Sequence, residues 1–95
     1  MKEEVNVVFS IIEEVFPEIE KRFDKQALGK FISCDYKDLT GYHFGLGLWI
    51  RNHLLAKNNE LKSLFVTGGV TSNDDISALI IRLFYIYERN KLLGK

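Results

Sequence analysis

The stretch YHFGLGLWIRNHLL, which runs from Tyr42 to Leu55, decides the fold that the sequence predicts. Its apolar residues cover more than one face of a helix, a pattern typical of a helix buried on several sides at the centre of a domain. We expect this helix to begin with Thr40 as its N-cap and to end at about Leu55. Gly45 and Gly47 each cost about 1 kcal/mol relative to alanine in a helix. A close approach by another backbone would explain them; alternatively, they lie in a turn and the helix begins later.

The first forty residues predict an amphipathic helix and then a weaker pattern. From about Glu3 to Phe16, apolar residues recur at spacings of three and four, and glutamates fill the other face. Pro17 either kinks this helix or occupies the first position of a second one. Residues 24–39 predict a short helix followed by a loop.

The second half of the chain predicts a short helix with clear ends. It runs from Glu60 to about Thr67, and Asn58 or Asn59 is its N-cap. Gly68-Gly69 ends it, because glycine readily adopts the left-handed conformation that follows a helix.

Ser72 caps a last helix, which runs to about Asn90. Strand signals are too short to form a sheet. The sequence therefore predicts an all-α fold, a compact single-domain bundle of four to five helices over residues 1–95. The apolar face that we expect on the last helix consists of Ile76, Leu79, Ile80, Leu83, Ile86 and Tyr87.

The charge pattern weakens the case for one class of partner. The chain holds 13 Lys and Arg against 13 Asp and Glu, so its formal net charge is zero. Obligate binders of polyanions carry a basic excess, which makes nucleic acid a weak candidate. The first twenty residues are acidic and the C-terminal end is basic. Either these ends attract each other or both form solvated faces, and the second reading is favoured because exposed ion pairs contribute little stability.

Cysteine usage and hydropathy bear on the location of the protein. Cys34 is the only cysteine and cannot form an internal disulfide. The start of the chain lacks the apolar segment of a signal peptide. The longest apolar stretch, Ile76–Tyr87, is interrupted and too short to span a bilayer. We expect a cytoplasmic protein that does not enter a membrane.

Arg51 and Asn52 need polar partners, because an unpaired guanidinium is costly to bury. Asp74 and Asp75, at the start of the last helix, are the obvious candidates. One interpretation is an anion or carboxylate site at that helix end. The favoured interpretation is a structural polar pairing, since the two aspartates would repel the anion.

The histidines do not predict a metal centre. In one α-helix, His43 and His53 would lie about 15 Å apart along the axis, too far to share a metal. Cys34 and His43 could form a thiolate–imidazole pair, but a buried or incidental cysteine is favoured. The spacing Gly45-x-Gly47 lacks the third glycine of a dinucleotide fingerprint. The sequence thus predicts no catalytic residue, no metal and no cofactor, and we expect a protein that is not an enzyme.

The aromatic run in the last helix leaves two readings open. Phe84, Tyr85 and Tyr87 cover more than one helix face, which indicates an interface with a protein partner or a second copy. The alternative is a central helix that its own neighbours wrap. Aromatics beside Arg82 and Arg89 could also stack on bases, which is the least favoured choice because the first helix is acidic.

Two blocks of sequence, His43–Asn52 and Gly69–Ser77, resemble a small uncharacterised bacterial family. That family has a Gly-x-x-Ile-Arg-Asn element followed by an Asp-Asp-Met-Ser element, in which Ile76 here replaces the methionine. The resemblance lies within residues 40–85, outside the first forty residues. It implies one domain and pairing between the Arg-Asn and Asp-Asp-Ile-Ser elements. It implies no activity, substrate or cofactor.

Taken together, these patterns favour a non-catalytic protein-interaction or regulatory module, with a protein partner or a homodimer. The alternative is a small-ligand or catalytic site around Arg51, Asn52, His43 and His53, for which the sequence names no small molecule. A second alternative is single-stranded nucleic-acid binding by the last helix.

Overall fold

The computed structural model describes the backbone of residues 2–93 and the side chains of residues 10–92. Within these limits every regular element is helical and no strand is present, so the all-α prediction is confirmed. Elements with 3-10 or π geometry carry the letter η. In chain order the elements are α1 (Lys2–Glu20), α2 (Lys25–Ser33), η1 (Tyr36–Tyr42), η2 (His43–Gly47), η3 (Ile50–Leu55), α3 (Asn59–Thr67) and α4 (Asn73–Leu93).

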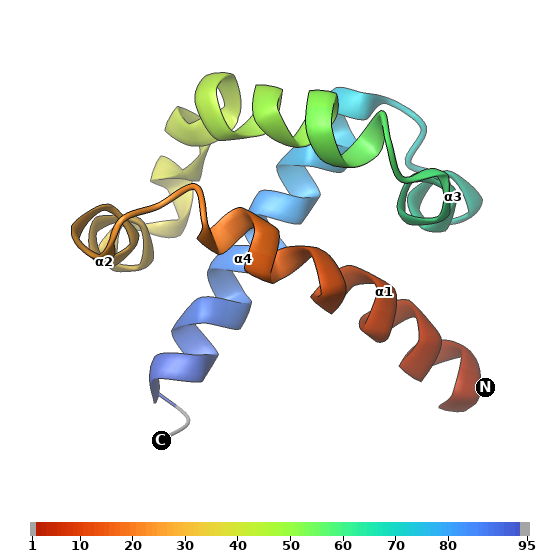
Figure 1. Cartoon of the computed structure of the whole chain (residues 1–95), viewed down its shortest axis with the longest axis horizontal. Coiled ribbons are helices and arrows are strands. Elements are labelled where there is room, and N and C mark those ends of the chain that lie inside the picture. The colour runs from red at the N-terminus through yellow and green to blue at the C-terminus, as the bar shows by residue number, and fades with distance from the viewer. Residues whose placement is uncertain (1, 94–95) are drawn as a thin grey trace.

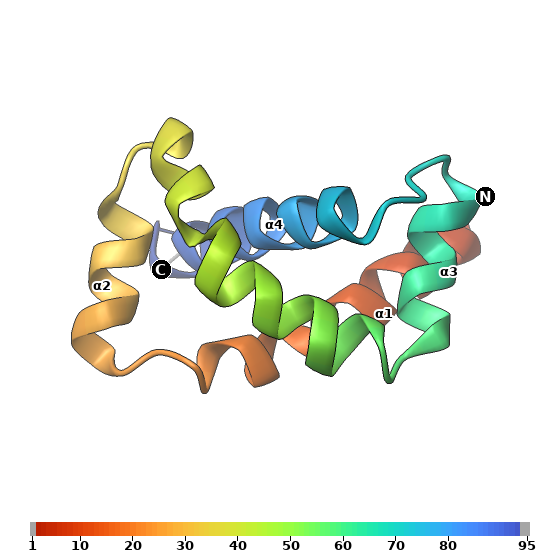
Figure 2. The same ribbon diagram turned by 90° about the horizontal axis from the view of Figure 1, so that it is seen from above.

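The long helix α4 lies at the centre of this arrangement (Figure 1). The helix α1 crosses α4 on one side, and the segment from η1 to η3 crosses it on another (Figure 2). The short helices α2 and α3 lie at opposite ends, where α2 contacts α4 and α3 contacts both α1 and η3. Every other element therefore packs around α4 or against a helix that does.

An aromatic cluster around Phe84 joins the N-terminal elements to α4. The Phe84 ring is fully buried and lies 5.7 Å from the ring of Phe16 on α1 and 5.5 Å from that of Phe31 on α2. Phe23, in the connection between these helices, stacks on the same ring at 6.1 Å. Aromatic pairs at such distances contribute about 0.5–1.5 kcal/mol beyond the burial of their area. One side chain of α4 thus fixes two helices and their connection.

The buried face of α4 differs from the predicted one. Ile76, Ile80, Phe84 and Glu88 follow each other at a spacing of four and are all buried. The predicted face included Ile86, whose side chain is 46% exposed. The prediction is confirmed at Ile76 and Ile80 and wrong at Ile86, because neighbours cover α4 on several sides and apolar residues alone do not mark its inner side.

The prediction of an interface at Phe84 and Tyr85 is wrong, because the chain itself buries both side chains. Phe84 is 0% exposed and Tyr85 is 5% exposed. Tyr87 is half-buried, and its ring lies 4.5 Å from the ring of Phe16. The alternative reading, a central helix wrapped by its own neighbours, describes α4.

The helix α1 runs through Pro17 and does not restart there. The second helix begins only at Lys25, where the Asp24 carboxylate caps it by accepting a hydrogen bond from the Ala27 amide at 2.7 Å. Burial of Ile19 stabilises the turn that follows the proline. The part of the predicted apolar stripe that precedes residue 10, with Val5, Val8 and Phe9, lies outside the side chains that the structure describes.

The stretch from Tyr42 to Leu55 is helical, but it is neither a regular α-helix nor buried on all sides. It follows the 3-10 turns of η1 and contains the π turns of η2 and η3. Thr40 does not cap it; its hydroxyl donates to the Lys37 carbonyl at 3.4 Å within η1. Phe44 is 81% exposed and Leu48 is 50% exposed. The buried side chains, among them Ile50, face α4, and the opposite face is open.

The predicted ends of the short helix α3 are confirmed. The Asn58 side chain accepts a hydrogen bond from the Leu61 amide at 3.0 Å, as an N-cap does. After the helix, Gly69 has a φ of 96°, the left-handed conformation that glycine adopts without strain. Both signals are local, which is why the sequence alone identifies them.

Replacement of the central aromatic side chain tests this description of the core. We expect Phe84→Ala to lower the free energy of unfolding by about 3–5 kcal/mol, because it removes a fully buried ring from among three others. Ile86→Ala, on the exposed side of the same helix, should cost less than about 1 kcal/mol. Urea denaturation of both variants measures the difference, and equal losses would contradict this core.

Candidate functional site

Arg51, on η3, reaches across to the first turn of α4. Its Nη1 donates to the Ser77 hydroxyl at 3.0 Å, and its Nε lies 3.4 Å from the Asp74 carboxylate. The Ser77 hydroxyl in turn donates to the Asp74 carbonyl at 2.9 Å. The Arg51 side chain is mostly buried, and its polar partners are the Asp74 carboxylate and the Ser77 hydroxyl. This arrangement holds η3 against α4 and engages two of the five N–H donors of Arg51.

Gly47 makes room for this guanidinium. A Cβ atom at Gly47 would lie 3.2 Å from Nη1 of Arg51 and 3.7 Å from Nδ1 of His43. A Cβ atom at Gly45 would meet nothing within 4 Å. Of these two glycines, only Gly47 permits a close approach. The group that approaches it is the Arg51 side chain and not another backbone.

Of the four residues predicted to pair, the structure brings Arg51 and Asp74 together and leaves Asn52 and Asp75 at the surface. The Asp75 amide lies 3.5 Å from the Ser72 hydroxyl, at the start of the helix. The buried partner that sequence reasoning did not single out is Ser77. The sequence signal for Ser77 was its place in the Asp-Asp-Ile-Ser element, four residues before the apolar Ile81.

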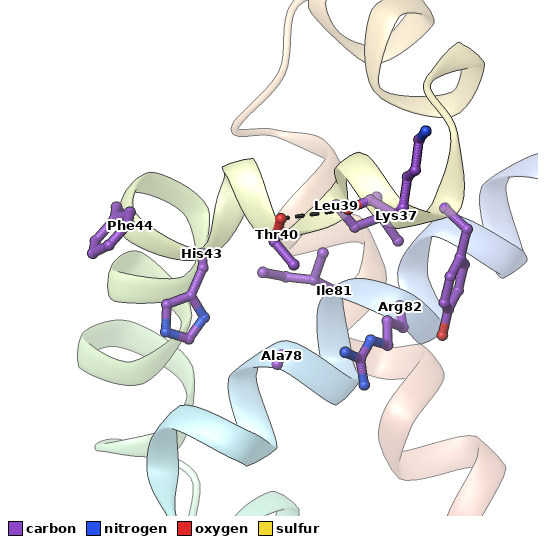
Figure 3. Close-up of a pocket in the computed structure, with 9 residues that line it drawn as sticks. Lys37, Leu39, Thr40, His43, Phe44, Ala78, Ile81 and Arg82 are labelled. Atoms are coloured by element: carbon purple, nitrogen blue, oxygen red, sulfur yellow. Dashed lines mark hydrogen bonds between the residues drawn. The ribbon is translucent and has the colours of Figure 1, made fainter.

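The residues of the small-ligand alternative do not converge. His43 faces the space between η2 and α4 (Figure 3). His53 instead stacks on Trp49, with ring centres 5.5 Å apart and an angle of 15°. Arg51 is engaged with α4 and Asn52 is exposed. Among the side chains of residues 10–92, no group of His, Cys, Asp and Glu could hold a metal ion.

Cys34 is held as a thiol and does not pair with His43. Its Sγ donates to the Phe31 carbonyl at 3.1 Å, at the end of α2. Burial raises the pKa of the Cys34 thiol, and the nearby carboxylates of Asp38 and Asp35 raise it further. Both effects disfavour the nucleophilic thiolate.

The aromatic rings beside Arg82 and Arg89 of α4 are not both free to stack on bases. Arg89 donates to the Ile32 carbonyl at 3.0 Å and to the Tyr85 hydroxyl at 2.6 Å. The Tyr85 hydroxyl donates to the Cys34 carbonyl at 2.6 Å, so both side chains close the C-terminal end of α2. Only Arg82 of this pair of arginines is exposed.

A groove of about 410 Å³ lies between α4 and the start of the η1–η3 segment (Figure 3). Its floor is apolar and consists of Leu39, Ala78 and Ile81, the first and last of which are buried. His43 points from η2 toward Ala78, whereas Phe44 turns outward at the rim (Figure 3). The other lining residues are Tyr36, Lys37, Thr40 and Arg82.

The charged residues that line this groove are all basic. Its lining includes Lys37 and Arg82 but no Asp or Glu. Neither cation forms an ion pair with a side chain of residues 10–92. The Arg82 guanidinium instead lies 6.0 Å from the ring centre of Tyr36. Sequence reasoning missed the groove because residues 35–38 resemble a loop, whereas the chain forms the 3-10 turns of η1 there.

The exposed apolar surface continues beyond the groove. Phe44 at the rim and Leu48 on the next turn are both large and exposed, and Tyr36, on the side of η1, is 53% exposed. Exposed apolar side chains that gather into a patch on a small domain are typical of an interaction site.

A pair of carboxyl groups lies at the far end of α4. Glu88 is only 5% exposed, and its Oε2, which has no hydrogen-bond partner among the described residues, lies 3.6 Å from Nζ of Lys91. The same ammonium lies 2.7 Å from Oε2 of Glu20 on α1. Burial, reinforced by the adjacent Glu20, raises the pKa of Glu88 to about 7. Glu88 and Lys91 donate to Glu20, which lowers the pKa of that carboxyl.

A family model described as a domain of unknown function, DUF6794, matches residues 10–87. The chain belongs to this family. No curated protein and no solved structure matches it. The DUF6794 match includes the groove and the Arg51 pairing, and it begins well before residue 40, where the resemblance seen in the sequence started.

The DUF6794 chain has no helix, within the part that the structure describes, that combines the length and apolar character needed to cross a membrane.

The two glycines of the DUF6794 stretch provide a matched test of the Arg51 packing. Gly45→Ala should raise the free energy of unfolding by about 0.5–1 kcal/mol, because alanine favours helix and the added methyl enters open space. Gly47→Ala should gain less or lose stability, since its methyl would press on Arg51. Thermal or urea unfolding measures both; an equal gain at the two positions would contradict the packing described.

The carboxyl pair predicts that stability depends on pH. A carboxyl whose pKa is raised on folding binds more protons in the folded than in the unfolded chain, so the free energy of unfolding falls as pH rises from about 4.5 to about 7. Relative to Glu88→Gln, which cannot ionise, the wild type should lose about 1–3 kcal/mol between about pH 5 and about pH 8. Urea unfolding at several pH values measures this difference. Glu18→Gln, on the exposed side of α1, is the control and should follow the wild type.

Proposed function

We propose that this DUF6794 chain is a non-catalytic protein-interaction module, and that its binding surface is the groove between η1–η2 and α4 together with the exposed apolar residues beside it. The observation that carries the proposal is Phe44, whose side chain is 81% exposed at the rim of an apolar groove. Covering an exposed phenylalanine with a partner gains about 1.5–3 kcal/mol, so this exposure favours association.

The extent of the apolar surface favours a protein partner over a small ligand. A small ligand could fill the groove, whose volume of about 410 Å³ lies in the usual range for such sites. It would leave Leu48 in water and cover little of Phe44, because Leu48 does not line the groove and Phe44 turns outward at its rim. A segment of another protein can occupy the groove and cover both.

The absence of convergent chemistry among the described residues supports a role in binding. The polar groups with catalytic potential are engaged elsewhere: Arg51 with Ser77, and the Cys34 thiol with a backbone carbonyl. The histidines point to different surroundings. A regulatory role, and a location in the bacterial cytoplasm, form part of this proposal; they rest on the sequence resemblance and on the single cysteine.

Selection from a random peptide library on the immobilised wild-type protein tests the proposal. We expect peptides that lose about tenfold in affinity or more on Phe44→Ala, which removes the rim, and on Ala78→Leu, which fills the floor. Ile86→Ala, an exposed apolar position outside the surface, should bind them unchanged. Fluorescence anisotropy with labelled peptides measures each affinity.

Two results of this experiment would contradict the proposal: no enriched peptide, or peptides that bind all variants equally. Light scattering over a concentration series identifies a second copy as the partner, if the wild type forms a dimer that Phe44→Ala dissociates. That outcome would support the interaction surface and assign it to self-association.

A further inference from the structure

We infer that the groove recognises an acidic peptide segment, in which an apolar side chain occupies the floor and a neighbouring carboxylate pairs with Arg82. This inference rests on the proposed interaction function and adds the chemistry of the partner. It depends on the distribution of charge around the groove and on the state of Arg82.

The groove is a locally cationic surface on a neutral chain. Its lining holds Lys37 and Arg82 and lacks any carboxylate, although the chain has as many acidic as basic residues. Asp35 and Asp38 flank Lys37 in sequence but do not line the groove. Both aspartates lie close enough to Cys34 to raise the pKa of its thiol. An acidic partner thus meets positive charge without facing a carboxylate in the lining.

Arg82 is the residue best prepared to bind a carboxylate. The other arginines that face α4 or its neighbours already donate hydrogen bonds: Arg51 to Ser77, and Arg89 to a carbonyl and to Tyr85. Arg82 donates none within the described side chains, and its guanidinium lies near the Tyr36 ring. The face of a tyrosine ring attracts a guanidinium and leaves its edge donors free. Those donors form the paired hydrogen bonds that match a carboxylate.

The floor of the groove adds an apolar requirement. Leu39 and Ile81 are buried and Ala78 is small, which leaves a depression rather than a flat surface between η1 and α4. One apolar side chain of a partner can enter there, in contact with the three. A carboxylate next to that side chain then lies at the rim, where Arg82 is exposed. The recognised segment therefore combines an apolar anchor with adjacent Asp or Glu.

A peptide fits this surface better than nucleic acid does. A phosphate backbone needs several cations in a row, because most of its affinity comes from the release of counterions. The groove supplies two cations, of which Lys37 points away from the floor (Figure 3). An apolar floor also contributes nothing to binding a phosphate. A peptide with one carboxylate beside one apolar side chain requires one cation and an apolar floor, and the groove supplies both.

The test uses peptides selected on the full chain and measures their affinity for charge variants by fluorescence anisotropy. We expect enriched sequences to share an apolar residue flanked by Asp or Glu. Their affinity should fall by about tenfold or more on Arg82→Glu and by only a few-fold on Arg82→Lys, which keeps the charge but not the paired donors. Lys57→Glu, an exposed charge reversal outside the groove, should leave the affinity unchanged. Circular dichroism and melting temperature verify that each variant is folded.

The outcomes separate this inference from the proposed function. Selected peptides without acidic residues, or peptides indifferent to Arg82→Glu, would overturn the acidic partner, while their loss of binding to Ala78→Leu would still support a peptide groove. Peptides that bind Ala78→Leu as well as the wild type would overturn both. A labelled oligothymidylate that binds the chain and is displaced by a selected peptide would overturn the inference in favour of nucleic acid.

Discussion

The packing of Phe84 is the interaction on which the rest of the structure depends. This one ring contacts aromatic side chains from α1, from the α1–α2 connection and from α2, so it sets the position of these two helices. Because those elements cover one side of α4, the segment from η1 to η3 must pack on another. The edge where that segment meets α4 holds Ala78 and Arg82, and the groove forms there.

The polar side chains on the buried face of α4 are accommodated in two different ways. Ser77 is fully buried, but Arg51 and a backbone carbonyl satisfy its hydroxyl, so it ties η3 to α4 at little cost. Glu88 has no such donor at one oxygen and shares its surroundings with Glu20 and Lys91. Both arrangements connect α4 to a neighbouring element, and the second depends on a proton.

Local signals account for the parts of the fold that the sequence predicts. The cap at Asn58 and the left-handed Gly69 depend only on neighbours in the chain, and both were predictable. The continuation of α1 through Pro17 and the exposure of Phe44 depend on what packs against those residues, which composition does not reveal. The burial of Glu88 was predictable in principle, because this residue follows Ile76, Ile80 and Phe84 at intervals of four. The groove was not predictable, because it forms only where η1 and α4 meet.

The stacking of Trp49 on His53 has a spectroscopic consequence. Trp49 is the only tryptophan of the chain, so its fluorescence reports on one place, the outer side of the η3 region. The Arg22 guanidinium lies 5.2 Å from the centre of the same indole ring. The emission of the folded protein will therefore report on the packing around Trp49.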